Sequence, residues 1–249
     1  MKTLLLPFAN PSKIRSANGI CSHLNHFLTA CAVNAQTCLN NNKTLLFLGD
    51  SITDSHRLWL SGTDTLGDGY VKMLSDISTE KHFSITFINK GHDGLTLPHL
   101  LRNLSRDCFP YSPDVISILI GINDIFVARN CGAAFSGKTF SDQYGKLLDA
   151  LRAGTQADIL CMSPFLLPYP QEYALWLPDI QQAEAAISAQ AAGHGCLFMP
   201  LQDFFQKAAQ DMGYDAITPD GVHLTPLGHR LLAQRWMEET ALFASANNL

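Results

Sequence analysis

Short apolar runs alternate with longer amphipathic segments from residue 44 onward. The clearest run, Asp-Val-Ile-Ser-Ile-Leu-Ile at 114–120, has the length and β-branched character of a buried strand. The predicted strands lie at 45–48, 84–89, 114–120, 158–162 and 196–199. The predicted helices lie at 69–81, 97–107, 140–152, 171–192 and 225–242. Five strands that alternate with helices imply a parallel sheet covered on both faces.

Two prolines mark helix boundaries in this pattern. Pro178 lies inside the alanine- and glutamine-rich segment 171–192 and predicts a break there, because proline lacks the N–H group that a helix interior needs. Pro226 follows Thr225, and this pair is typical of an N-cap residue followed by the first helical position.

Composition excludes several classes of protein. Hydrophobic residues make up 47% of the chain and charged residues 16%, which suits a sizeable buried core. The net charge of -5 argues against a nucleic-acid partner, which usually meets a basic face. No apolar run reaches the length of about 18 residues that predicts a transmembrane segment. The 7 cysteines are scattered without a C-x-x-C pair, which favours buried thiols over a zinc site or a disulfide framework.

Residues 1–43 lack the strand and helix rhythm. They are predicted to form a weakly structured or helical N-terminal extension, followed by one domain at 44–249. Within the extension, Leu-Thr-Ala-Cys at 28–31 resembles a bacterial lipoprotein cleavage site, so export or lipoprotein anchoring stays open. The segment before it carries His23 and His26, which are too polar for a good signal sequence. A cytoplasmic location is therefore favoured.

Four polar clusters follow predicted strands or precede the last predicted helix. They are Gly-Asp-Ser-Ile-Thr-Asp at 49–54, Asn-Lys-Gly-His-Asp-Gly at 89–94, Gly-Ile-Asn-Asp at 121–124 and Asp-Gly-Val-His at 220–223. In a doubly wound sheet, reactive groups gather in the crevice beyond the carboxyl ends of the strands. The clusters are therefore expected to meet at one edge of the sheet.

Ser51 and His223 have the chemistry of a nucleophile and its base. A serine hydroxyl becomes a good nucleophile only when a neighbouring base takes its proton. Histidine suits that task because its pKa lies near neutrality. A carboxylate must hold the imidazole in the right tautomer, and Asp220 lies three residues before His223 on the same predicted loop. These residue types predict a catalytic set of Ser51, His223 and Asp220.

Taken together, the clusters resemble the GDSL, or SGNH, hydrolase family, which is named for a serine, a glycine, an asparagine and a histidine in four sequence blocks. The matching residues are Ser51, Gly91, Asn123 and His223, and the likeness covers about residues 44 to 240. The residues within these blocks look like those of the bacterial small-esterase branch of the family. The resemblance implies a three-layer α/β/α sandwich with a five-stranded parallel sheet in the flavodoxin-like order 2-1-3-4-5.

The same resemblance implies a serine esterase that hydrolyses carboxylic esters, with short acyl groups and acetyl foremost. It implies an oxyanion hole made of the backbone N–H groups of Ser51 and Gly91 and the side-chain amide of Asn123. It implies no cofactor and no metal. The expected partner is a small-molecule or carbohydrate ester. Carbohydrate deacetylase, lysophospholipase and thioesterase activities, all found in the family, stay open.

A metal-dependent phosphoesterase is the alternative from a different class. Asp50, Asp54, Asn123, Asp124 and His223 carry groups that bind divalent ions. The chain has no D-x-H before Asp50 and no later G-H-x-H, so the spacing of a two-metal site is not met. We instead expect Asp50 and Asp124 to make structural hydrogen bonds in their loops.

The sequence alone assigns no role to two features near the clusters. The segment 165–176 is rich in aromatic residues and follows a predicted strand, so it either walls the pocket or packs as an ordinary helix. His56 and His92 lie beside the first and second clusters and are read as incidental.

Overall fold

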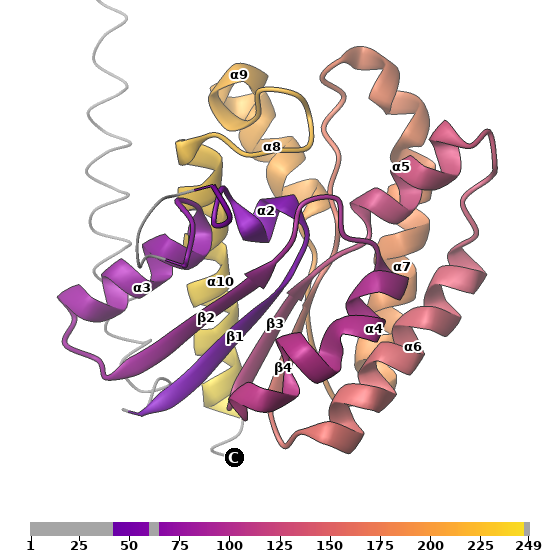
Figure 1. Cartoon of the computed structure of the whole chain (residues 1–249). Helices are drawn as coiled ribbons and strands as arrows, with labels where there is room; N and C mark the ends of the chain where they lie inside the picture. Colours follow the sequence, from indigo (N-terminus) through magenta and orange to yellow (C-terminus); the bar gives the residue numbers. More distant parts are fainter. Residues whose placement is uncertain (1–41, 60–64, 247–249) are drawn as a thin grey trace, which may run out of the picture.

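The fold is taken from a computed structural model, which describes residues 42–59 and 65–246, with side chains to residue 240 (Figure 1). The predicted N-terminal extension and the cleavage-like site at Cys31 lie outside these residues, apart from Asn42 and Lys43. The first strand begins at Lys43, one residue before the predicted boundary.

A five-stranded parallel sheet forms the centre of the described chain, in the order β2-β1-β3-β4-β5. Its strands are β1 (Lys43–Gly49), β2 (Ile85–Gly91), β3 (Val115–Leu119), β4 (Asp158–Met162) and β5 (Leu197–Met199). All five predicted strands are confirmed, and so is the order 2-1-3-4-5.

Helices cover both faces of the sheet, which confirms the three-layer prediction (Figure 1). One face carries α4 (Leu97–Asp107), α5 (Ile122–Asn130), α6 (Gly137–Gly154) and α7 (Leu177–Gly193). The other carries α3 (Tyr70–Glu80), α8 (Gln202–Met212) and α10 (Pro226–Ala246). The short elements are α2 (Ser51–Asp54), α9 (Tyr214–Ile217) and two 3₁₀ helices, η2 (Phe109–Tyr111) and η3 (Gln171–Trp176).

The central strand β1 contributes to both hydrophobic cores. Leu46 and Leu48 pack in the core under α4 and α6, whereas Leu45 and Phe47 pack in the core under α3 and α10. Successive side chains of a strand point to opposite faces, so a strand covered on both sides must be apolar throughout. This explains why β1 reads as a continuous apolar run instead of an alternating one.

The last helix is fixed at its start and in its middle. Thr225 Oγ1 accepts a hydrogen bond from the N–H of Gly228 at 3.1 Å, which confirms Thr225 as the N-cap before Pro226. Further along, the indole Nε1 of Trp236 donates to Ser117 Oγ on β3 at 2.9 Å, with both residues almost fully buried. A buried polar pair of this kind is tolerated because each group satisfies the other.

The break predicted at Pro178 is confirmed, because the segment 171–192 is divided into the 3₁₀ helix η3 and α7, with Pro178 in the first turn of α7. Other parts of the helical pattern differ from the prediction. The sequence pattern did not predict α5 or α8. In α5 only Ile122 and Ile125 are buried, which leaves too short an apolar stripe for a periodicity argument. No helix in the described part of the chain is long and apolar enough to cross a membrane.

Candidate active site

One cleft beyond the carboxyl ends of the strands holds residues from all four predicted clusters. Its volume is about 410 Å³. It is lined by Ser51, Ile52, Ser55, His56, Asp93, Gly94, Asn123, His223, Leu224 and His229. The expectation that the clusters meet at one edge of the sheet is therefore confirmed.

Ser51 occupies the first position of α2, immediately after the end of β1. Asp50 caps this short helix, and its Oδ1 accepts the N–H of Ile52 at 3.1 Å. Within the described residues, the N–H of Ser51 has no hydrogen-bond partner. Ser51 thus brings a hydroxyl group and an unoccupied N–H donor to the same place in the cleft.

Ser51, His223 and Asp220 form a continuous hydrogen-bonded chain. Ser51 Oγ lies 3.0 Å from His223 Nε2, and His223 Nδ1 lies 2.6 Å from Asp220 Oδ2. An ionised carboxylate only accepts hydrogen bonds, so Nδ1 carries the proton and Nε2 presents its lone pair to the serine hydroxyl. This is the tautomer that a general base for Ser51 requires.

The carboxylate of Asp220 is held firmly in its ionised form. Its Oδ1 accepts the backbone N–H groups of Val222 at 3.0 Å and His223 at 2.8 Å. Burial alone raises the pKa of Asp220, but the hydrogen bonds from the His223 ring and these N–H groups outweigh it and leave the pKa below its usual value.

Asn123 lies in the first turn of α5, where its side chain is half-buried and lines the cleft. Its Nδ2 donates to the carbonyl of Leu95 at 3.1 Å. That bond uses one of the two amide hydrogens and fixes the orientation of the amide plane. The second amide hydrogen has no hydrogen-bond partner among the described residues.

Gly91, predicted to donate to the oxyanion, lies outside this cleft. Its N–H already donates to Asn89 Oδ1 at 2.8 Å, and its carbonyl accepts a hydrogen bond from Arg57 at 2.5 Å. A Cβ atom on this glycine would lie 2.2 Å from the backbone nitrogen of Asp54. Gly91 therefore serves close packing of β2 against α2, and its N–H has no capacity left for a substrate.

Gly94, and not Gly91, has the available N–H group in the cleft that was expected of Gly91. It lines the cleft together with Ser51 and Asn123, and its N–H has no partner among the described residues. Its φ of +68° lies in the left-handed region that glycine adopts without strain. The sequence already offered Gly94 as a candidate, because it is the last residue of the same cluster. Which of the two glycines has an available N–H group depends on the hydrogen bonds that form in the fold.

Asp50 and Asp124 make the structural hydrogen bonds that the sequence predicted. Asp124 accepts the N–H of Leu97 at 3.0 Å and thereby ties α5 to α4. Burial raises the pKa of Asp50 to about 7 and that of Asp124 to about 6. One oxygen of Asp50 has no partner in the described residues. Next to residues that line the cleft there is thus one carboxylate whose pKa is lowered, Asp220, and two whose pKa values are raised, Asp50 and Asp124.

Residues 47–231 match the GDSL-like Lipase/Acylhydrolase family. The chain belongs to this family. An acetylxylan esterase from Geobacillus stearothermophilus is 27% identical over 209 residues, which cover 81% of this chain and 95% of that enzyme.

Solved structures give the same picture as the family match. The crystal structure of Axe2, an acetylxylan esterase from Geobacillus stearothermophilus, superimposes with a TM-score of 0.73 at 25% identity, covering 82% of this chain and 96% of that one. A protein described as a GDSL-like lipase from Parabacteroides merdae superimposes with a TM-score of 0.75 at 29% identity, covering 82% and 98%. Catalytic mutants of Axe2 include a serine-to-alanine and an aspartate-to-alanine variant. With this family and these esterases as relatives, the chain is a carboxylic ester hydrolase.

The aromatic segment 165–176 does not line the cleft of this GDSL-family hydrolase. Phe165 is fully buried in the core under α10, and Tyr173 and Trp176 pack against Phe126 at ring-centroid distances of 5.6 and 4.7 Å. The segment also contacts the turn that holds Asp220, because a Cβ atom on Gly221 would lie 3.0 Å from the ring of Tyr173. The structure therefore shows Phe165, Tyr173 and Trp176 in ordinary packing contacts and not as a wall of the cleft.

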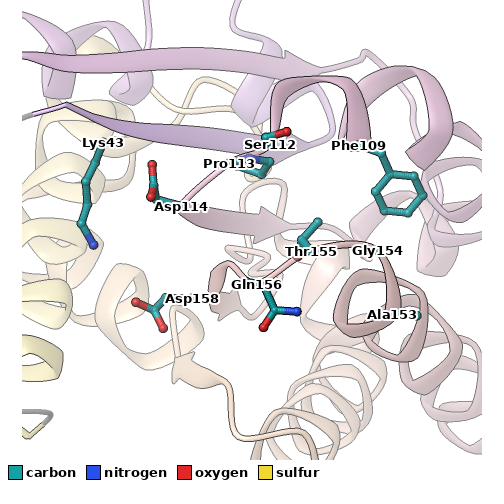
Figure 2. A pocket seen from close by; sticks show the side chains of 10 residues that line it. All are labelled: Lys43, Phe109, Ser112, Pro113, Asp114, Ala153, Gly154, Thr155, Gln156 and Asp158. Atoms are coloured by element: carbon teal, nitrogen blue, oxygen red, sulfur yellow. The ribbon is translucent and has the colours of Figure 1, made fainter.

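A larger depression of about 530 Å³ lies at the opposite end of the strands (Figure 2). Among the labelled side chains, the carboxylates of Asp114 and Asp158, the amine of Lys43 and the ring of Phe109 surround it. Asp114 Oδ2 is already bonded to the N–H of Thr44 at 2.7 Å. No histidine is among the residues that line this depression, whereas the smaller cleft holds Ser51 beside His223.

The described residues contain no group of three or more His, Cys, Asp or Glu side chains placed to hold a metal ion. Of the residues considered for a phosphoesterase site, Asp54 is fully buried and paired with Arg57 Nε at 3.3 Å. Asp50 is likewise buried as a helix cap. Asp54 is thus held by an ion pair and Asp50 by a helix-capping hydrogen bond.

Proposed function

We propose that this GDSL-family hydrolase cleaves acetyl esters by a serine mechanism, with Ser51 as nucleophile, His223 as base and Asp220 as the group that orients the base. The contact that carries the proposal is the 3.0 Å approach of Ser51 Oγ to Nε2 of His223. The catalytic serine and aspartate mutants of Axe2 support the same choice of residue types.

The proposed reaction needs these residues and one water molecule. Ser51 Oγ bonds to the ester carbonyl carbon while its proton passes to His223 Nε2, and the carbonyl oxygen takes up the negative charge. When the bond to the alcohol breaks, His223 returns the proton to the departing alkoxide, and the acetyl group remains on Ser51. A water molecule, deprotonated by His223, then attacks this acyl-enzyme, releases acetic acid and restores the serine.

The proposed oxyanion hole has three hydrogen-bond donors. They are the backbone N–H groups of Ser51 and Gly94 and the side-chain Nδ2 of Asn123, which share one cleft and have capacity to donate. Donors that are fixed before the reaction need no reorganisation as charge develops, and removing one typically costs about 3 to 4 kcal/mol of transition-state stabilisation.

A short acyl group suits the lining of this cleft. Of the lining residues only Ile52 and Leu224 are large and apolar, and both lie beside the catalytic set in the chain. A long acyl chain would need a more extended apolar groove. The acetylxylan esterases among the relatives support acetyl as the acyl group.

A panel of p-nitrophenyl esters from acetyl to palmitoyl, run beside a lysophospholipid and a thioester, tests the acyl preference. We expect kcat/KM to be highest for acetate and to fall steadily with chain length. A maximum at palmitoyl, or faster turnover of the lysophospholipid, would replace the acetylesterase proposal with a lipid-directed one.

A chelator separates the serine mechanism from the metal-dependent phosphoesterase. Activity on p-nitrophenyl acetate should persist after dialysis against EDTA, and bis(p-nitrophenyl) phosphate should not be hydrolysed. Activity that disappears with EDTA and returns with a divalent ion would favour the phosphoesterase.

A further inference from the structure

Four cysteines lie in the described part of the chain, and all four are free thiols. Cys108 and Cys161 are buried, Cys196 is half-buried and Cys131 is exposed. The expectation of buried thiols is thus confirmed for Cys108 and Cys161 and wrong for Cys131. Cys161 lies on β4 and Cys196 directly precedes β5, the strand that pairs with β4. Neither residue lines the cleft that holds Ser51.

Cys161 and Cys196 lie on the same face of the sheet. Cys161 is paired with Phe198, which is two residues after Cys196. Because side chains two residues apart on a strand point to the same side, both thiols face the core under α6 and α7, and the two sulfurs are hydrogen-bonded. β5 is an edge strand that pairs with β4 alone, so it has freedom to adjust when the two sulfurs approach.

Arg152, close to the end of α6, donates a hydrogen bond to the sulfur of Cys196. Its Nη2 lies 3.3 Å from Cys196 Sγ. Within the described residues its other hydrogen bonds go to the backbone carbonyls of Ala157, His194 and Gly195. A guanidinium stays positively charged at any physiological pH, so Cys196 is the one partner that can balance this charge by losing a proton.

His194 adds a second cationic group beside Cys196. Its Nδ1 lies 2.7 Å from the carbonyl oxygen of Gln190, and its Nε2 lies 3.1 Å from Asp149 Oδ1. Both of these oxygens only accept, so the ring makes both bonds only in its positively charged form. The Asp149 carboxylate is 76% exposed and bonds to the imidazole, not to the sulfur. Reactive cysteines lie in electropositive, partly exposed surroundings of this kind.

The hydrogen bond between the two cysteines determines which sulfur loses its proton. The bond from Cys161, followed by the charge of Arg152, lowers the pKa of Cys196 below its usual value, although burial opposes both. The same bond, together with burial, raises the pKa of Cys161 well above its usual value. Cys196 is therefore the thiolate of the pair, and Cys161 is the thiol that donates to it.

Tyr144 supplies an unused donor beside the pair. Its hydroxyl is fully buried and makes no hydrogen bond of acceptable geometry within the described residues. Burial, with Cys161 as a further cause, raises the pKa of Tyr144 well above its usual value, so the phenol keeps its proton. An oxygen atom added to a sulfur here would give this hydroxyl an acceptor.

We propose that Cys196 is a modification site for hydroperoxides, at which a thiolate held by Arg152 is oxidised and Cys161 then closes a disulfide. The Cys196 sulfur attacks one oxygen of hydrogen peroxide and the O–O bond breaks. The sulfur is oxidised to a sulfenic acid, and the departing hydroxide takes a proton from solvent to become water. The Cys161 sulfur then bonds to the Cys196 sulfur, the S–O bond breaks, and the hydroxyl leaves with the Cys161 proton as a second water.

The first test uses Cys131 as a reference inside the same molecule. Cys131 is more exposed than Cys196, and its thiol has no hydrogen-bond partner among the described residues. Limiting iodoacetamide is added at pH 7, and peptide mass mapping measures the alkylation rate of each cysteine. We expect Cys196 to react at least about five times faster than Cys131, because the thiolate is the reactive form. Faster alkylation of Cys131 would show that exposure governs reactivity and would overturn the proposal.

Arg152→Gln tests the source of the reactivity. The alkylation rate of Cys196 should fall about tenfold while that of Cys131 stays unchanged. Arg102→Gln removes an exposed arginine on α4 and is the matched control, with no effect expected on Cys196. Because Arg152 also binds three carbonyls, the thermal midpoint of each variant is measured, and Arg152→Lys, which keeps the charge, should retain most of the rate. An unchanged Cys196 rate in folded Arg152→Gln contradicts the proposal.

Hydrogen peroxide tests the oxidation itself. In the wild type, the peptides that carry Cys161 and Cys196 should become linked with the loss of two hydrogens, and dithiothreitol should separate them. In Cys161→Ser the sulfenic acid cannot be resolved, so dimedone should label Cys196. Dimedone labelling of the wild type without a disulfide would exclude Cys161 from the reaction, and oxidation of Cys131 ahead of Cys196 would reject the site. None of these measurements uses ester hydrolysis, so failure here leaves the esterase proposal untouched.

Discussion

Gly91 packs directly against the backbone of Asp54, at a distance where a Cβ atom would lie 2.2 Å from the Asp54 nitrogen. This contact seats the helix that begins with Ser51 onto the end of β2. Asn89 reinforces it from the same strand, because its Nδ2 donates to the carbonyl of Thr53 at 2.6 Å. The position of Ser51, the proposed nucleophile, therefore depends on Gly91, which does not line the cleft.

Gly91→Ala should destabilise the protein by about 3 kcal/mol, since the added methyl group meets backbone atoms that have no room to move. Urea denaturation measures the change. Gly94→Ala is the comparison, because a Cβ there meets nothing within 4 Å and only the left-handed backbone opposes it, at about 1 to 2 kcal/mol. Equal losses in the two variants would contradict the packing role of Gly91.

Ser51→Ala should remove nearly all esterase turnover, with a loss on the order of 10⁴-fold in kcat, while the fold persists. Ser51 is half-buried, and among the described residues its hydroxyl is bonded only to His223, so its loss leaves the packing unchanged. Steady-state rates on p-nitrophenyl acetate and the thermal midpoint together check this. Near-normal turnover in the variant would transfer the nucleophile role to another residue.

Asn123→Ala should lower kcat by about 10² to 10³ with little change in KM, because the amide bonds most strongly to the developing oxyanion. If Asn123 only anchors Leu95, the main effect should instead be a stability loss of about 1 kcal/mol.

Asn123→Asp probes the same amide more sharply. The substitution is nearly isosteric but places a negative charge where the oxyanion forms, so it should be at least as damaging as alanine. Measurements of kcat and thermal midpoint on both variants decide between the roles, and an active aspartate variant would remove Asn123 from the catalytic proposal.

Asp50 predicts a pH dependence of stability. Burial raises its pKa from 3.8 to about 7, so the folded state holds this proton over a range in which the unfolded chain releases it. The wild type therefore loses stability from this group as the pH rises from about 4 to about 7. Asp50→Asn cannot ionise and should gain stability relative to the wild type over that range, by at most about 4 kcal/mol. Denaturation at pH 4 and pH 8 measures the difference, and a constant difference would contradict the raised pKa.

The alternation of strands and helices and the pairing of Ser51 with His223 and Asp220 were predictable from the sequence. Strand periodicity is a local property, and Asp220 and His223 are close neighbours in the chain. Residues at the carboxyl ends of adjacent parallel strands must also converge once the strand order is set. For these features, short segments carry the necessary information.

The choice of Gly94 over Gly91, and the hydrogen-bonded surroundings of His56, depended on the tertiary structure. Both glycines lie in the cluster at 89–94, and only the fold shows that the N–H of Gly91 already donates to Asn89. Asp68 holds His56 and also accepts a hydrogen bond from Ser55. Ser55 in turn contacts His229, which lies 174 residues further along the chain than Ser55. Hydrogen-bond partners that are distant in sequence leave no local pattern, because the geometry that joins them exists only after the sheet and α10 have packed.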